Sequence, residues 1–481
     1  MADHYEIPPL KLYYAIAGGS LREKPPSGAW GIQTRNELLE EQYTIRKELA
    51  EIINRLRNEG FEINVSGGEI FNNENEVFVK NNEIISSDSL LIFAVGPRVN
   101  VMRALLSFGK PTIVFIKSGM RYYTFAEIFS ARIVRAETDI TMLYDPHDVF
   151  VVYDNYEELA KILRALYGVH ALKKSRILYI GTPYGWQGRF NELRAVNKKI
   201  GIDIVFLDHD RAYEEAQEYL STDKAHKEIS EIARKLKEES TKLELDEEGI
   251  TKGIKLFVGL KYLAEKYKAN VITISLEYSI PEPTMGSLPS GTAYGCMAYG
   301  ASKWGATPCL AFSLLDDEGL LGVCEGDMTN LVAKTLLRYI SNKPVAFANP
   351  SIPAKGTEAV FAHCTAPTKM LGFKNKAFKY ILTTHFETNS PAAIKVLFEP
   401  GHHITLLNFS FNLDHAIIAR GEVLGYTDYP ICRSQIRVKF KDTKELYENA
   451  KGFHWSYVYG DYVDELKYAL KLLKIEYKII E

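Results

Sequence analysis

The sequence contains little cysteine, no long apolar run and little net charge. Its five cysteines are scattered along 481 residues, and no two of them form a CxxC pair. A disulfide framework or a zinc knuckle is therefore not expected, and most thiols are expected to pack as small hydrophobic side chains. No apolar run approaches the roughly 20 residues that span a bilayer, so we expect no membrane partner.

The charge balance and the first residues exclude further classes of protein. A formal net charge of −3 gives no bulk attraction to nucleic acid. The start of the chain, MADHYEIPPLKLYY, lacks the basic and apolar regions of a signal peptide, which predicts a cytoplasmic protein. The remaining composition, 46% hydrophobic and 25% charged, is that of an ordinary folded protein.

The chain is too long for one hydrophobic core, and its first part predicts α/β structure. Over residues 1–170, short apolar runs such as LYYAIAGG alternate with stretches of helical periodicity. The same alternation restarts over residues 171–350. Apolar strands that alternate with helices predict a parallel sheet covered on both faces, and hence two Rossmann-like α/β domains.

After Pro350 the pattern changes to short β-type runs with turn residues between them. These runs predict a third domain over residues 351–481, made of mostly antiparallel strands. A stretch of helical periodicity over residues 462–475 predicts a final helix.

The motif Cys324-Glu325-Gly326-Asp327 sets two carboxylates between two apolar segments. A buried carboxylate is costly unless a cation or several hydrogen-bond donors satisfy it. Glu325 and Asp327 also precede a predicted helix, and capping of its N-terminus would by itself explain an acidic pair at this point.

Histidines are concentrated in the last part of the chain, where six of the eleven lie between residues 363 and 454. His363 falls at the end of a predicted strand, and His454 stands at the start of another; each could simply be packed. Carboxylate and imidazole ligands together suit Mn²⁺, Co²⁺ or Fe²⁺ better than a thiolate-rich zinc site does. Such a site, if open to substrate, could act as a Lewis acid.

Several blocks in the second half of the chain share their order and spacing with a known family. They are PCLAFSLLDDEGLLGVCEGD, PVAFANPS, AHCTAPTKM, TTHFE and GFHWSYVYGDYVDELKYALKLLKIE, between residues 308 and 476. In these blocks the chain resembles the sugar isomerases of the L-fucose isomerase and L-arabinose isomerase superfamily. The resemblance implies two α/β domains followed by a β domain.

The resemblance also implies an activity and a set of site residues. The family interconverts aldoses and ketoses through an enediol, with a divalent metal that is commonly Mn²⁺; the substrate would be a deoxyhexose or pentose such as L-fucose or D-arabinose. Glu325 matches the metal-binding catalytic glutamate, with Asp327 as a second catalytic candidate, and His363 and His454 match metal ligands. A homo-oligomer, a trimer or hexamer, is implied as well.

Substrate contacts are implied in three further places. The polar loop SLPSGTAYGC contains Ser290, the block TTHFE contains His385 and Glu387, and Trp455 follows the matched histidine. Each of these residues could equally belong to an ordinary loop or strand end that has no contact with substrate.

One position departs from the family pattern. Asn349 stands 24 residues after Glu325, where fucose isomerases carry an aspartate. An amide oxygen can weakly ligate a metal, but it cannot accept a proton at neutral pH. The two-carboxylate proton relay is therefore incomplete unless Asp327 or Glu318 replaces the missing group. The alternatives are a non-catalytic sugar-binding protein of the same fold, or an epimerase or lyase that uses a similar enediolate.

Overall fold

The computed structural model describes most of the chain. The described residues are 6–18, 32, 34–95, 99–117, 145–181, 189–275 and 303–481. They fall into two compact units. What we call the N-terminal unit consists of Pro8–His170 with Lys467–Lys474, and the C-terminal unit contains Ala171–Leu466 and Ile475–Glu481. Within the described stretches, no helix combines the length and apolar character needed to cross a bilayer.

The N-terminal unit is built on a parallel sheet of five strands in the order β2-β1-β3-β4-β5. The strands are β1 (Leu10–Ala17), β2 (Ile63–Phe71), β3 (Ser89–Ala94), β4 (Thr112–Ile116) and β5 (Val149–Tyr153). Every residue of β3 and β4 is buried, as expected for strands with both faces covered.

Helices connect these strands, and their starts follow from the local sequence. The helical elements are α1 (Arg35–Asn58), α2 (Glu74–Val79), α3 (Asn81–Ser86), α4 (Val99–Leu106), a short 3₁₀ turn (Pro146–Asp148) and α6 (Tyr156–Lys174). At the start of α1, the Thr34 hydroxyl accepts from the Glu37 backbone N–H, and the Glu37 carboxylate accepts from that of Thr34. This capping box satisfies two donors that the first helical turn leaves unpaired.

The C-terminal unit contains a second parallel sheet, of four strands in the order β10-β9-β6-β7. The strands are β6 (Arg176–Ile180), β7 (Asp203–Leu207), β9 (Val271–Ile274) and β10 (Leu321–Val323). The helices in this part are α7 (Arg189–Lys199), α8 (His209–Leu220), α9 (Asp223–Glu239), α10 (Glu247–Tyr267), α12 (Cys309–Glu318) and α13 (Met328–Ser341). A small sheet joins β8 (Lys242–Leu243) to β13 (Tyr380–Thr383) and β14 (Ala393–Val396).

The last part of the C-terminal unit is a closed antiparallel sheet. Its strands follow the order β15-β18-β11-β12-β17-β16, and β16 pairs back with β15. They are β11 (Ala346–Ser351), β12 (Glu358–His363), β15 (His403–Phe409), β16 (His415–Tyr426), β17 (Ser434–Lys439) and β18 (Trp455–Tyr459). In the sequence, α14 (Thr443–Asn449) lies between β17 and β18 and α15 (Val463–Leu472) follows β18, while β19 (Glu476–Ile480) adds to β16 in parallel.

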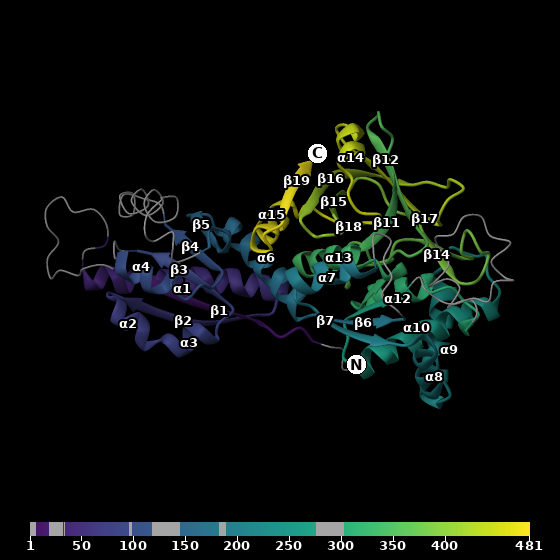
Figure 1. Ribbon diagram of the computed structural model, residues 1–481, viewed down its shortest axis with the longest axis horizontal. Helices are drawn as coiled ribbons and strands as arrows, with labels where there is room; N and C mark the ends of the chain where they lie inside the picture. The colour runs from purple at the N-terminus through teal and green to yellow at the C-terminus, as the bar shows by residue number, and fades with distance from the viewer. Residues whose placement is uncertain are drawn as a thin grey trace. The chain divides into compact units, whose positions relative to one another are not determined.

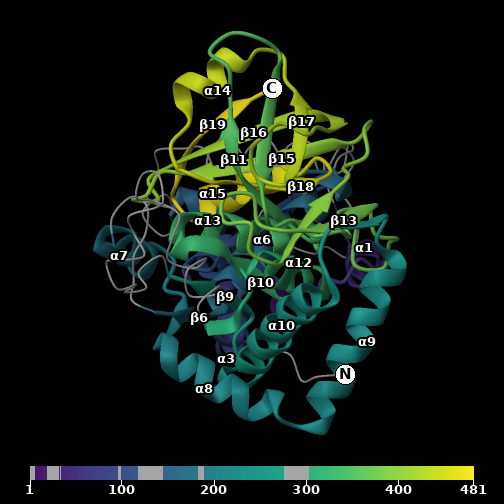
Figure 2. The same cartoon turned by 90° about the vertical axis from the view of Figure 1, so that its right-hand side faces the viewer.

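The helix α13 lies between the two large sheets of the C-terminal unit. Figures 1 and 2 both show the closed sheet, drawn green to yellow, on one side of α13 and the teal parallel sheet on the other. The helix contacts β15 and β18 on the first side and β10 and α7 on the second. One hydrophobic core runs from Leu178 of the parallel sheet through Leu310 to Trp455 of the closed sheet.

The architecture confirms the coarser part of the sequence prediction. The chain is a mixed α/β protein with two parallel sheets and a C-terminal antiparallel sheet. The domain limits at residues 170 and 350 stay predictions. The chain ends in the strand β19 after the predicted helix, because EYKII pairs with β16 once α15 has ended.

Candidate metal site

Three side chains predicted as metal ligands converge in the C-terminal unit. Glu325 follows β10, His363 ends β12, and His454 directly precedes β18. Each offers one ligand atom, and these atoms all lie within 4.8 Å of one another. All three residues are buried, with 8%, 6% and 2% of their surface exposed. This buried Glu/His/His group could hold a metal ion.

Glu325 sits in an unusual backbone conformation. It belongs to a 3₁₀ turn, Cys324–Gly326, and has φ 65° and ψ 13°, in the left-handed region. Gly326 is left-handed as well. For a side chain such as glutamate this conformation costs on the order of 1–3 kcal/mol, and such strain is concentrated at functional sites. The turn follows the carboxyl end of a parallel strand, which is where α/β sheets bind ligands.

Asp327 connects this turn to both α13 and His454. Its Oδ1 accepts from the backbone N–H of Asn330 and from the hydroxyl of Thr329, both at 2.9 Å, which caps the helix. Its Oδ2 lies 2.8 Å from Nδ1 of His454. Both carboxylate oxygens are therefore engaged, and Asp327 holds the imidazole of His454 in one orientation by accepting a hydrogen bond from its Nδ1–H.

The second ring nitrogen of His454 faces the site. Its Nε2 lies 3.7 Å from Oε2 of Glu325. Burial is the largest influence on the pKa of His454 and lowers it, but the hydrogen bond to Asp327 and the charges of Glu325 and Asp327 outweigh it, so the pKa is raised. The same contact holds the pKa of Asp327 below its usual value in spite of its burial. A metal ion bound at Nε2 would displace a proton held by this pair of charges.

His363 is suited to ligation because it stays neutral. Burial, which is the largest cause, and the nearby His454 together lower its pKa to about 3. Its Nδ1 lies 2.8 Å from the Thr365 hydroxyl and 3.2 Å from the Thr365 backbone N. In one tautomer Nδ1–H donates to the Thr365 hydroxyl, and the lone pair of Nε2 is left for a metal. In the other tautomer Nδ1 accepts from the Thr365 backbone N–H, and Nε2 carries the proton.

Two buried polar atoms at this place show that the residues fit a metal ion. Among the described residues, Nε2 of His454 and Oδ1 of Asn349 have no hydrogen-bond partner. Asn349 lies on β11 opposite Ala362, the residue before His363. An unsatisfied buried polar atom is costly, and a cation held by the three ligands would satisfy Nε2 of His454. Carboxylate, imidazole and amide oxygen together suit a hard or borderline divalent ion.

The predicted substrate contacts lie in different surroundings. His385 is buried; burial lowers its pKa most, yet contact with Cys364 and the charges of Glu387 and Glu325 raise it overall. Glu387 is exposed. Trp455 is fully buried, with its ring 6.0 Å from that of Phe361 in the core. The roles of these residues in substrate binding stay predictions.

Two other sequence candidates lie away from the triad or outside the described chain. Ser290 and its loop fall outside the described residues. Glu318, at the end of α12, forms an ion pair with Lys261 at 2.7 Å. That ion pair gives Glu318 a partner of its own, so it offers no support for a role as the missing carboxylate.

Glu192 is a buried carboxylate near the site that sequence reasoning missed. Glu192 of α7 has 1% of its surface exposed, and its Oε2 accepts from the backbone N–H of Met328 at 3.4 Å. Its negative charge contributes to the raised pKa of His454. Nothing in the surrounding run RFNELRAV distinguishes this glutamate from a solvated one, because only the tertiary fold brings α7 beside α13.

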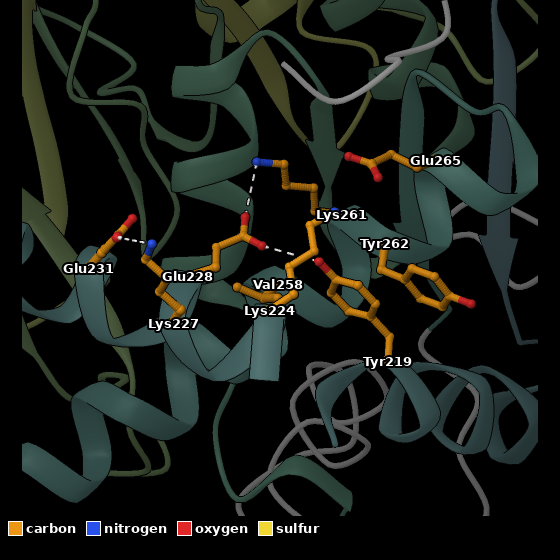
Figure 3. A pocket seen from close by; sticks show the side chains of 9 residues that line it. All are labelled: Tyr219, Lys224, Lys227, Glu228, Glu231, Val258, Lys261, Tyr262 and Glu265. Carbon is orange, nitrogen blue, oxygen red and sulfur yellow. Dashed lines mark hydrogen bonds and ion pairs between the residues drawn. The ribbon is translucent and has the colours of Figure 1, made fainter. Parts of the chain in front are cut away.

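A separate pocket of about 400 Å³ lies between α8, α9 and α10 (Figure 3). It is lined by Tyr219, Lys224, Lys227, Glu228, Glu231, Val258, Lys261, Tyr262 and Glu265. The rings of Tyr219 and Tyr262 stack at 4.5 Å, and Lys261 pairs with Glu228 at 3.4 Å. The pocket contains none of the predicted site residues, and its lysines and glutamates are mixed, so the Glu/His/His group remains the candidate site for chemistry.

No protein-family model and no curated protein matches this chain. The buried Glu/His/His group and the sequence blocks around it are therefore the features of this protein that bear on its function.

Proposed function

We propose that this protein is a metal-dependent aldose–ketose isomerase of the L-fucose isomerase and L-arabinose isomerase superfamily, with two Rossmann-like α/β domains and a C-terminal β domain. One observation carries the proposal: the ligand atoms of Glu325, His363 and His454 lie within 4.8 Å of one another in a buried site. These are the three residues that the resemblance picks out as metal ligands, from points far apart in the sequence. The proposed substrate is a deoxyhexose or pentose such as L-fucose or D-arabinose.

The proposed metal is Mn²⁺, held by Glu325, His363 and His454 with the Asn349 amide oxygen beside them. When bound, a divalent ion would supply a Lewis acid for the oxygens on C1 and C2 of the open-chain sugar. The carboxylates of Glu192, Glu325 and Asp327 are buried and all three raise the pKa of His454, so a cation bound beside this imidazole would be attracted by all three.

Each residue has a proposed task. Glu325 would take the proton from C2 of the aldose and deliver a proton to C1, while the hydroxyl proton on O2 passes to O1, which gives the ketose through the enediol. Asp327 keeps Nδ1 of His454 protonated, so that Nε2 is the ligating atom. Asn349 offers an amide that can bind a sugar hydroxyl, and Glu325 then carries the proton without a second carboxylate.

The test is ketose formation from a panel of aldoses, led by L-fucose and D-arabinose, in Mn²⁺ and again in chelator. In D₂O, exchange of the proton held on Glu325 with solvent would place deuterium at C1 of the ketose, whereas a hydride shift would not. Glu325→Gln should abolish turnover, and Glu318→Gln, which changes a glutamate on the preceding helix, should not. Full turnover by the Glu325→Gln variant would overturn the assignment.

Asn349 favours a second candidate, in which the fold is retained and the reaction differs. A non-catalytic sugar-binding protein would bind the aldose without product, and an epimerase or lyase would give an aldose or fragments from the same enediolate. Identification of the products by NMR separates these cases from the isomerase. A homo-oligomer, a trimer or hexamer, belongs to the main proposal and is tested by light scattering on the purified protein.

A further inference from the structure

A fully buried ion pair lies next to the candidate metal site. Nζ of Lys334, on α13, is 2.6 Å from Oδ2 of Asp316, on α12, and the two side chains are 0% and 1% exposed. A pair of this kind is a weak source of stability, because removal of two charges from water costs about as much as their attraction returns. Burial raises the pKa of Asp316 to about 7 in spite of the lysine beside it. The pair therefore calls for an explanation other than stability.

The ion pair binds the backbone of β10, the strand that leads to Glu325. Lys334 donates to the backbone oxygen of Gly322 at 2.6 Å, and the backbone N–H of Gly322 donates to Oδ1 of Asp316 at 3.1 Å. Gly322 lies on β10, an edge strand of its sheet, three residues before Glu325. The ion pair thus satisfies the outer donor and acceptor that a further strand would otherwise pair with.

Close packing fixes the same strand from another side. A Cβ at position 322 would lie 2.6 Å from the ring of Phe312, so only glycine lets β10 approach α12 this closely. The backbone of β10 is therefore held by one ion pair and one ring directly before the chain turns into the left-handed Glu325.

The ion pair also holds the aromatic side chain beneath the two histidines. Nζ of Lys334 lies 4.9 Å from the centre of the Phe347 ring, within the range of a cation–π contact. The centre of that ring is 4.4 Å from the imidazole of His363 and 5.3 Å from that of His454. Lys334 therefore contacts both imidazoles indirectly, through Phe347, and it also binds the strand that leads to Glu325.

We propose that Lys334 and Asp316 are positioning residues of the metal site, which hold β10 and Phe347 so that Glu325, His363 and His454 keep their metal-binding separation. The inference rests on the proposed function only in that this site binds a divalent ion. Neither residue is a ligand or a proton carrier, and both act through the groups that they hold.

The test measures metal binding directly, with Mn²⁺ titrated calorimetrically into the full chain and Co²⁺ followed by its visible absorption. The variant K334M/D316L replaces both charges with apolar side chains of similar size, so no charge is left buried alone. We expect it to fold and to bind Mn²⁺ at least about tenfold more weakly, with an altered Co²⁺ spectrum. The matched control K261M/E318L removes an ion pair between α10 and α12 that touches no ligand, and should leave affinity and spectrum unchanged.

The outcomes separate this inference from the proposed function. Wild-type affinity and an unchanged Co²⁺ spectrum in K334M/D316L would overturn the inference, whatever the protein catalyses. If that variant does not fold, the variant K334R is the test. It retains the charge, but its planar guanidinium cannot reproduce both short contacts of Lys334, so we expect weaker Mn²⁺ binding and an altered Co²⁺ spectrum. Wild-type binding by K334R would refute the inference. A wild-type protein that binds Mn²⁺ but forms no ketose removes the isomerase and leaves this test valid, whereas one that binds no divalent ion overturns both.

Discussion

Nδ1 of His454 lies 2.8 Å from Oδ2 of Asp327, while the other oxygen of the same carboxylate caps α13. One side chain therefore serves both a helix terminus and a candidate metal ligand. The orientation of the imidazole is coupled to the start of α13, and a change at Asp327 should affect metal binding and helix stability by different amounts.

The variant Asp327→Asn separates these two roles. Asparagine is as good an N-cap as aspartate, so the contribution of the cap to the free energy of unfolding should change by less than about 1 kcal/mol. Its NH₂ group cannot accept a hydrogen bond, however, and would face the Nδ1–H of His454 donor to donor. We expect Mn²⁺ affinity to fall about 10- to 100-fold, measured by calorimetry.

Asp327→Ala is the matched control, because it removes the cap and the acceptor together. It should lose about 1 kcal/mol more stability than Asp327→Asn, with a similar loss of affinity. Equal Mn²⁺ affinity in the wild type and both variants would show that the contact does not orient the ligand.

The variant Glu325→Gly should be more stable than the wild type without metal. Glycine adopts φ 65° without a steric penalty, and the change also removes a buried carboxylate, so a gain of about 1 kcal/mol or more is expected in thermal unfolding. Saturating Mn²⁺ should raise the melting temperature of the wild type and leave that of the variant unchanged.

Glu325→Gln provides the control for this experiment, since it retains the strained backbone and loses the charge. It should gain less stability than Glu325→Gly. A glycine variant no more stable than the glutamine variant would mean that the left-handed backbone is not strained.

The variant Asn349→Asp tests how the site tolerates the departure from the family pattern. A carboxylate in place of the unsatisfied amide oxygen should strengthen Mn²⁺ binding and lower the stability of the metal-free protein, because a further buried charge then lacks a partner. Calorimetry and thermal unfolding with and without Mn²⁺ measure the two effects. Weaker Mn²⁺ binding by Asn349→Asp than by the wild type would place the amide away from the ion.

The pH dependence of the N-terminal unit should include a contribution from Asp145. Its ion pair with Lys474, together with the backbone N–H of His147, holds the pKa of Asp145 below its usual value. A carboxyl whose pKa is lowered by folding contributes stability that is fully present above its unfolded pKa of about 3.9 and is lost as pH falls through the folded value.

The check is the urea midpoint of the wild type and of Asp145→Asn at pH 7 and at pH values below 4. We expect the wild type to be modestly more stable at pH 7 and the difference to shrink on acidification. A difference that stays constant, or that grows as pH falls, would show that the ion pair with Lys474 is not what lowers the pKa of Asp145.

The sequence predicted the parts of the fold and site that depend on local pattern. The buried runs of β3 and β4 are visible as continuous apolar stretches, and the triad was found because Glu325, His363 and His454 lie in blocks of recognisable order. The left-handed backbone of Glu325 carries no such pattern, since a glutamate there is unfavourable by local preference.

Residues that act through tertiary contact could not be found in this way. Glu192, Asp316 and Lys334 stand in helices whose sequences give no reason to expect buried charge. Their roles depend on which helices meet, and α7, α12 and α13 are brought together only by the folded unit. The amphipathic pattern of a helix predicts that one face is buried, but it does not say which buried lysine meets which buried aspartate.

The closed sheet has a consequence for how the protein can change during evolution. His363 ends β12 and His454 directly precedes β18, and β11, which carries Phe347 and Asn349, is hydrogen-bonded between these two strands. Because the strands form a ring without a free edge, the spacing of the two imidazoles is inherited from the ladder and not from the segments that join the strands. Insertions or deletions in those segments can therefore alter what approaches the candidate site while the spacing of its two imidazoles stays the same.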